Sequence, residues 1–154
     1  MVELKHATQR YFRCAGSLGW AFPASLVVKS ALPNRPVLCF TGDGSFYYHI
    51  SELETAARFG INVVVLVNNN HSLDQEQRLF NAAYGGTQRG RAHEMWMFKE
   101  TNFAKVAEGM GCFGIRVEKP DELRSALQRA FSSGRPAVID AVSDYKVLHP
   151  RAWA

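Results

Sequence analysis

Two short polar segments carry the residue types best suited to chemistry: Thr41-Gly42-Asp43-Gly44-Ser45 and Asn68-Asn69-Asn70. In the first segment, the glycines allow a ligand to come close to the backbone, and a helix starting at Ser45 would offer free N–H groups to a phosphate. Asp43 would repel that phosphate unless a cation lay between them. The segment therefore predicts a phosphate group bound through a hard divalent cation such as Mg²⁺.

The three consecutive Asn residues are a second source of ligands for the same ion. Amide and backbone carbonyl oxygens suit Mg²⁺, which prefers octahedral oxygen coordination. Either segment alone is a weak signal, since a G-D-G loop or an Asn cluster is most often only a turn or a cap. The order strand, G-D-G, helix, strand, N-N is much less expected by chance, and it favours one joint site.

The elements that must position these segments alternate between strand and helix, which indicates an α/β fold. Apolar runs predict strands at 36–41, 62–67, 113–117 and 137–142. Helical spacing of apolar residues predicts helices from Phe46 to Gly60, from a cap at Thr101 to Gly111, and from Pro120 to Gly134. Strands that are apolar on both faces predict a three-layer, doubly wound parallel sheet with helices on both faces. Such folds bind ligands at the carboxyl ends of their strands, where both polar segments fall.

The length of 154 residues suits a single domain, 1–154. The segment 71–100 is polar and contains several glycines, and a connection of that length is usually functional or disordered. We predict that it forms a mobile loop. Met95-Trp96-Met97-Phe98 within it is expected to be a packing anchor or an interface patch.

Composition argues against several other classes of function. The net charge is +4, but the basic residues are spread along the chain without a dense run, so we expect no nucleic-acid partner. No apolar run approaches the roughly 20 residues of a membrane-spanning helix, and no signal peptide is visible, so we expect no membrane association and a cytoplasmic location. Cys14, Cys39 and Cys112 form no C-x-x-C pair, which argues against a disulfide framework or a zinc site.

Together, the two polar segments resemble the fingerprint of the thiamine-diphosphate-dependent enzymes, which is G-D-G followed after a spacer by N-N. Here 24 residues separate Gly44 from Asn69. The resemblance is closest to the C-terminal diphosphate-binding domain of the acetolactate synthase and benzoylformate decarboxylase-like group. It extends to residues 15–24 (AGSLGWAFPA), 52–56 (ELETA) and 102–107 (NFAKVA), and it covers residues 14–143.

This resemblance implies that thiamine diphosphate and Mg²⁺ are the cofactors. It gives a binding role to Gly16, Leu18, Gly42, Asp43, Gly44, Ser45, Asn70 and Ser72. The side chains of Asp43 and Asn70 and the backbone carbonyl of Ser72 would be the Mg²⁺ ligands. Because three consecutive Asn residues blur the register, Asn68 and Asn69 are alternatives, although the spacing from Asp43 favours Asn70.

The remaining implied contacts concern the cofactor itself. Gly44 and Ser45 would contact the diphosphate through backbone N–H and hydroxyl groups, and the carbonyl of Gly16 would hold the aminopyrimidine. Leu18 would lie beneath the bent cofactor, with ordinary core packing as the alternative. His71, beside the expected metal site, would either line a substrate pocket or be a solvated loop residue.

One departure from the family pattern follows the metal-binding Asn. Where the family often has an aromatic residue and then a glycine, this chain has Leu73-Asp74. Substrate contacts made by the family at these two positions are therefore not carried over to this chain.

By resemblance, the complete enzyme would form or cleave a C–C bond next to the carbonyl of a 2-oxo acid, as a transferase or as a decarboxylase of the lyase class. The family's catalytic glutamate belongs to a separate pyrimidine-binding domain, so no catalytic residue is named here and the chain alone should lack turnover. We expect a pyrimidine-binding domain or subunit as partner, and self-association into a homo-oligomer. The chain would be a piece of the full enzyme or the small subunit of a two-chain decarboxylase. The alternative is a non-catalytic nucleotide- or phosphate-binding module.

Overall fold

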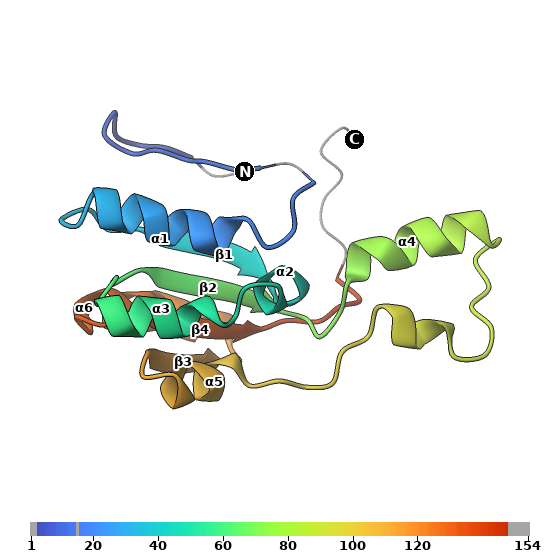
Figure 1. Cartoon of the computed structure of the whole chain (residues 1–154). Coiled ribbons are helices and arrows are strands. Elements are labelled where there is room, and N and C mark those ends of the chain that lie inside the picture. The colour runs from blue at the N-terminus through green and yellow to red at the C-terminus, as the bar shows by residue number, and fades with distance from the viewer. Residues whose placement is uncertain (1–2, 15, 148–154) are drawn as a thin grey trace.

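The computed structural model describes residues 3–14 and 16–147 (Figure 1). Ala15, the first residue of the 15–24 motif, lies outside the described residues. The described chain forms one sheet of four parallel strands in the order β1-β2-β4-β3. The strands are β1 (Leu38–Gly42), β2 (Val64–Asn69), β3 (Phe113–Val117) and β4 (Ala137–Val142).

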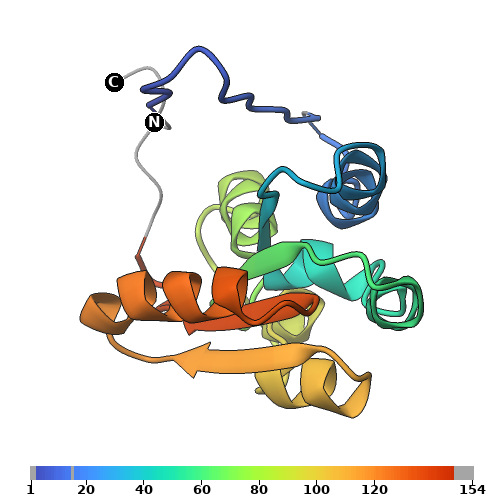
Figure 2. The same cartoon turned by 90° about the vertical axis from the view of Figure 1, so that its left-hand side faces the viewer.

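Helices cover both faces of this sheet, which confirms the predicted three-layer, doubly wound α/β fold. One face carries α1 (Ala21–Ala31), α2 (Asp43–Tyr47), α3 (Glu52–Phe59) and α5 (Phe103–Gly109). The other face carries α6 (Leu123–Ser132), preceded by the 3₁₀ turn η2 (Pro120–Glu122). Figure 2 shows α6 on one side of the sheet and α1, α3 and α5 on the other. Along the sheet, the chain runs in one direction from β1 through β2 to β3 and then returns from β3 to β4. Because each crossover is right-handed, this reversal places α6 on the opposite face from α3 and α5.

The core follows the alternation of side chains along the strands. Cys39, Val65 and Val138 point toward α1, α3 and α5 and are buried there with the aromatic rings of α1, α2 and α5. The ring of Phe46 lies 5.3 Å from that of Phe22 and 5.5 Å from that of Phe103, between centroids. Because Phe46 belongs to α2, this packing holds α2 against the carboxyl end of the sheet.

The helix predicted from Phe46 to Gly60 is wrong as a single element. The structure has two helices, α2 and α3, separated by residues 48–51. The cap predicted at Thr101 is also wrong by one residue, because the side chain of Asn102 accepts the hydrogen bond from the N–H of Lys105. Strand β2 ends at Asn69, two residues beyond the predicted end, so Asn68 and Asn69 belong to the strand. The four strands and the helix before β4 are confirmed.

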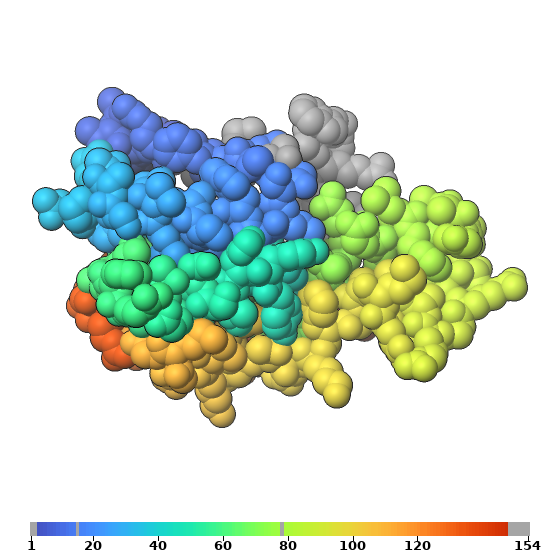
Figure 3. All heavy atoms as spheres, in the orientation of Figure 1, coloured from blue at the N-terminus to red at the C-terminus, as the bar shows by residue number. Residues whose placement is uncertain are grey.

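The segment 71–100 contains α4 (Asp74–Ala83) and the 3₁₀ turn η1 (Ala92–Met95), neither of which was predicted. Both project beyond the carboxyl edge of the sheet (Figures 1 and 3). The segment is closed at its base, since the N–H of Leu73 donates to the carbonyl of Trp96 and the N–H of Phe98 donates to that of His71, each at 2.8 Å. Trp96 is buried against Phe80, as expected of a packing anchor. Mobility of this segment stays a prediction.

No helix in the described part of the chain is both long enough and apolar enough to span a membrane.

Candidate functional site

The two polar segments meet at the carboxyl edge of the sheet, as the parallel strand order predicts. Gly42, the last residue of β1, pairs with Asn68 of β2. Asp43 is the first residue of α2, and Asn70 and Ser72 follow the end of β2. We predicted a helix that starts at Ser45, but α2 starts two residues earlier, at Asp43.

Asp43 is a buried carboxylate with an exposed fraction of only 3%. Its Oδ1 accepts a hydrogen bond from the N–H of Gly44 at 2.7 Å, and its Oδ2 accepts one from the N–H of Ser72 at 3.2 Å. Burial raises the pKa of Asp43, and the hydrogen bonds from the backbone lower it in part. A bound cation would stabilise a carboxylate that is buried in this way.

The side chain of Asn70 converges on the same point. Its Oδ1 accepts a hydrogen bond from the N–H of Ser72 at 3.1 Å, so this one amide lies between the oxygens of Asp43 and Asn70. His71 turns the chain here with a φ of 57°, the only positive φ at a non-glycine among the described residues. This turn brings Ser72, which is buried, back to Asp43.

The other two Asn residues face elsewhere. Asn69 is fully buried and its Nδ2 donates to Asp140 and to the carbonyl of Thr101. The Oδ1 of Asn68 accepts a hydrogen bond from the hydroxyl of Ser143 at 2.8 Å. Of the three alternatives, Asn70 is thus the one whose side-chain oxygen lies beside Asp43.

Two glycines of the G-D-G segment differ in the space around them: Gly44 is tightly packed, whereas Gly42 is open. A Cβ atom on Gly44 would collide with the side chain of Leu73 and come within 3.4 Å of the ring of Phe98, whereas one on Gly42 would meet nothing within 4 Å. Ser45 connects α2 to the preceding turn, because its Oγ accepts a hydrogen bond from the N–H of Gly19 at 2.8 Å. Of the two glycines, Gly42 is therefore the one with free space beside its backbone.

The upstream residues lie on the surface. Gly16 has a φ of 76°, and a Cβ there would meet nothing within 4 Å. Leu18 is 54% exposed, so the alternative of ordinary core packing is wrong for this residue. The cofactor contacts implied for Gly16 and Leu18 stay predictions.

Sequence reasoning missed an apolar groove beside the G-D-G loop. The groove has a volume of about 430 Å³ and is lined by Gly44, Tyr47, Tyr48, Leu73 and Phe98. Leu73 is one of the two positions where the chain departs from the family pattern, and here it closes over Gly44. No sequence signal joined these residues, because Phe98 comes from the far end of the 71–100 segment.

The donor set fits a hard cation. In the part of the chain that the structure describes, no three His, Cys, Asp or Glu side chains gather into a metal-binding group. The site instead combines one carboxylate, one amide and a backbone turn that offers carbonyl oxygens, and oxygen ligands of this kind suit Mg²⁺ with its remaining positions left to water and phosphate. Fold and site together define a class: parallel α/β domains with an oxygen-ligand site at the carboxyl edge of the sheet.

Comparison with known proteins narrows that class to a family. The family model described as thiamine pyrophosphate enzyme, C-terminal TPP binding domain, matches residues 2–141. Thiamine pyrophosphate (TPP) is another name for thiamine diphosphate. The chain belongs to this family of TPP-binding domains.

Its relatives are subunits of known enzymes. The chain is 45% identical to the acetolactate synthase large subunit of Haemophilus influenzae over 118 residues, which cover 77% of this chain and 20% of that protein. It is 37% identical over 120 residues to the acetolactate synthase isozyme 3 large subunit of Escherichia coli, covering 78% of this chain and 20% of that protein. The chain thus spans about 20% of the length of these relatives.

A solved structure shows the same arrangement. The thiamine diphosphate-dependent 4-hydroxybenzoylformate decarboxylase of Rhodococcus jostii RHA1 superposes with a TM-score of 0.72 at 28% sequence identity. The match covers 82% of this chain and 23% of that one. The likeness supports the parallel α/β assignment made from the sequence.

Proposed function

We propose that this chain binds the diphosphate end of thiamine diphosphate through an Mg²⁺ ion, as the C-terminal domain of an acetolactate synthase-like or 2-oxo acid decarboxylase-like enzyme. The observation that carries this proposal is the convergence of two oxygens, one from Asp43 and one from Asn70, on the N–H of Ser72. The ion would be held by these two side chains and by the backbone carbonyl of Ser72.

The chain's own residues have distinct roles in this proposal. Asp43 contributes the negative charge that holds the cation, and its burial keeps the carboxylate in one position. The open space at Gly42 admits a phosphate group to the backbone, and the N–H and hydroxyl groups of Gly44 and Ser45 would contact it. When bound, thiamine diphosphate acts as the electron sink for bonds next to a carbonyl, while the protein orients it.

The rest of the enzyme is part of the same proposal. The catalytic glutamate would come from a pyrimidine-binding domain or subunit, and the chain alone would have no turnover. The match to about 20% of the length of the relatives supports this division. The substrate would be a 2-oxo acid and the assembly a homo-oligomer. A cytoplasmic location belongs to the same proposal.

A calorimetric titration tests the cofactor assignment. Thiamine diphosphate and thiamine are each titrated into the chain in Mg²⁺ and in EDTA. Binding of thiamine diphosphate in Mg²⁺ alone, with no binding of thiamine, is the expected result, because the contacts are to the diphosphate. Equal binding of both compounds, or binding that persists in EDTA, would contradict the proposal.

A further inference from the structure

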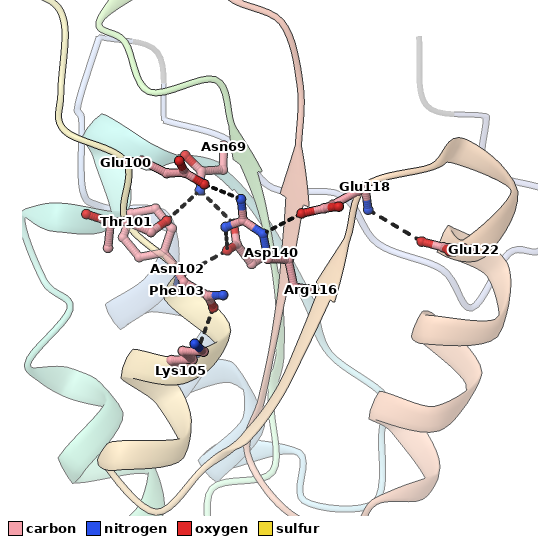
Figure 4. A network of polar contacts seen from close by, with 10 residues as sticks. All are labelled: Asn69, Glu100, Thr101, Asn102, Phe103, Lys105, Arg116, Glu118, Glu122 and Asp140. Atoms are coloured by element: carbon pink, nitrogen blue, oxygen red, sulfur yellow. Dashed lines mark hydrogen bonds and ion pairs between the residues drawn. The ribbon is translucent and has the colours of Figure 1, made fainter.

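A fully buried carboxylate contacts Asn69, the residue before the proposed metal-ligand segment (residues 70–72), and has no part in the function proposed above. This is Asp140 on β4, which Figure 4 shows with its polar contacts. Its exposed fraction is 0%. Its Oδ1 accepts a hydrogen bond from Nδ2 of Asn69 at 2.7 Å. Its Oδ2 accepts two more at 3.0 Å, one from the N–H of Phe103 and one from Nη1 of Arg116.

Packing alone gives no reason for a charge at this position. Asp140 lies in the apolar run A-V-I-D-A-V, on the face of the sheet that carries α5. A buried ion pair is often no more stabilising than apolar side chains of the same size, and its best-attested use is to specify one arrangement of its neighbours. Here the neighbours come from three elements: β2, β3 and the start of α5.

The most direct of these contacts leads to the metal-ligand segment. Asn69 is the last residue of β2 and immediately precedes Asn70. Its two Nδ2 hydrogens are both used, one by Asp140 at 2.7 Å and one by the carbonyl of Thr101 at 3.0 Å. These two hydrogen bonds fix the side chain of Asn69 at the end of β2, where the chain leaves the sheet.

A second contact links Thr101 to α2, the helix that begins with Asp43. The Oγ1 of Thr101 accepts a hydrogen bond from the hydroxyl of Tyr47 at 2.6 Å. Tyr47 is the last residue of α2, and Asp43 is the first. The hydrogen-bonded series Asp140–Asn69–Thr101–Tyr47 therefore joins the last residue of β2, which precedes Asn70, to the last residue of α2, which begins with Asp43.

We propose that Asp140 is a positioning residue for the metal-ligand segment and acts on it through Asn69. The inference rests on the proposed function, since it concerns the same Mg²⁺ site. Asp140 does not touch the ion. It holds the end of β2 so that Asn70 and Ser72 reach Asp43 before any ion arrives.

Arg116 offers the matched control. Its guanidinium contacts Asp140 from β3 and also pairs with Glu100 at 2.7 Å and Glu118 at 3.0 Å. Burial acts to lower the pKa of Arg116, but the hydrogen bond to Glu118 and the charge of Asp140 raise it on balance. Replacing Arg116 by Met removes the counter-charge of Asp140 and leaves the Asn69 contact in place.

The substitution Asp140→Asn keeps the shape of the side chain, but only one of its two terminal atoms can then accept hydrogen bonds. All three neighbours of Asp140 are donors, so the amide of an Asn must place a donor against a donor. Mg²⁺ is titrated into the chain at a fixed excess of thiamine diphosphate and followed in the ¹H–¹⁵N NMR spectrum. We expect Asp140→Asn to weaken the apparent affinity for Mg²⁺ about 10-fold or more. We expect Arg116→Met to lower the melting temperature and to change Mg²⁺ affinity less than about twofold.

The outcomes are distinct. A Mg²⁺ affinity of Asp140→Asn within about twofold of that of the parent would overturn the inference. An equal loss of Mg²⁺ affinity in Arg116→Met would also overturn it, because it would indicate a purely structural role. If Asp140→Asn does not fold, Asn69→Ala replaces it, with the same expected loss and the same contrary result.

If the parent chain shows no Mg²⁺-dependent binding, the proposed function fails and the positioning role is tested without metal. Ser72 donates its N–H to Asp43 and Asn70 in the metal-free chain. We expect hydrogen exchange of this amide to be about 10-fold faster or more in Asp140→Asn than in the parent, and unchanged in Arg116→Met. Unchanged exchange in Asp140→Asn would overturn the inference.

Discussion

At the scale of single residues, the backbone of His71 stores strain between Asn70 and Ser72, the residues proposed to bind Mg²⁺. Its φ of 57° lies in the left-handed region, which is unfavourable for residues with a Cβ. We expect His71→Gly to raise the free energy of unfolding by about 1 kcal/mol, because relief of the strain outweighs the greater flexibility of glycine in the unfolded chain. Urea unfolding followed by circular dichroism measures the change.

His93→Gly is the control for this prediction. His93 lies in the 3₁₀ turn η1 without a positive φ, so the same replacement should lower stability by about 0.5 to 1 kcal/mol. A loss of stability in His71→Gly as large as that in His93→Gly would show that the turn at position 71 is not strained.

The three cysteines differ in their surroundings, and their reactivity should differ in the same way. Cys14 is exposed, while Cys39 and Cys112 are buried. Burial raises the pKa of Cys39 to about 11, and burial also raises that of Cys112. At pH 8, a thiol-reactive disulfide reagent should modify one thiol rapidly and the other two only in denaturant, since the thiolate is the reactive form. Rapid modification of a second thiol in the folded protein would contradict the structure.

The burial of Cys39 also makes the free energy of unfolding depend on pH in the alkaline range. Because the pKa of Cys39 is higher in the folded protein than its ordinary value of 9.0, the neutral thiol favours folding. This contribution is fully present below pH 9 and is lost as pH rises toward about 11. A Cys39→Ala variant should lose less stability than the parent over that interval, as measured by urea unfolding. An identical loss in both proteins would contradict the assignment.

At the scale of elements, the contact between β3 and α5 depends on one glycine. A Cβ on Gly114 would collide with the backbone carbonyl of Ala104 and lie 2.7 Å from its carbonyl carbon. Backbone cannot rotate away as a side chain can, so α5 would have to shift. We expect Gly114→Ala to reduce the free energy of unfolding by about 2 to 3 kcal/mol in urea unfolding.

The matched control is Gly109→Ala, at the end of α5. A Cβ there would meet nothing within 4 Å, and the residue is helical. Alanine should therefore be neutral or stabilise the protein by up to about 1 kcal/mol. Equal effects of the two substitutions would mean that α5 does not pack on β3 as closely as described.

The elements also show what sequence patterns can and cannot predict. The strands were predictable because predominantly apolar runs such as 62–67 and 137–142 are typical of strands buried on both faces. Helix α4 was missed because its sequence, DQEQRLFNAA, is largely polar and packs mainly through Phe80 onto Trp96, which lies 16 residues further along the chain. The break between α2 and α3 was missed because Phe46 and Leu53 share a face across it.

The contacts of the candidate site also include some that the sequence predicts and some that it does not. Asp43 and Asn70 were predictable as a pair, since the carboxyl ends of neighbouring parallel strands must meet. The contact between Asn69 and Asp140 spans 71 residues and depends on the register of β2 against β4, which no local pattern encodes. The only trace of it in the sequence is a charged residue inside an apolar strand.

At the scale of the whole molecule, the face of the sheet around β1 carries exposed apolar side chains. β1 is an edge strand of the described sheet, and Leu38 and Phe40 on it are 47% and 68% exposed. Neither residue belongs to the interface patch expected from the sequence, 95–98. An exposed apolar edge strand favours association.

We therefore expect the chain to self-associate and Phe40→Lys to weaken that association. Since Phe40 is largely exposed, stability should change by less than about 0.5 kcal/mol. Sedimentation velocity over a range of concentrations measures the change, with Val27→Lys on the outer face of α1 as control. A parent chain that stays monomeric throughout, or equal effects of both substitutions, would contradict this prediction.

The central claim is that Asp43 holds a cation through which the chain binds a diphosphate. The most direct test is calorimetric titration of thiamine diphosphate in Mg²⁺ into the parent chain and into Asp43→Asn, which keeps the size of the side chain and removes its charge. Asp121→Asn, an exposed position in η2, is the control. We expect binding to the parent and to Asp121→Asn, and none to Asp43→Asn at the same concentrations. Undiminished Mg²⁺-dependent binding by Asp43→Asn would contradict the role proposed for Asp43.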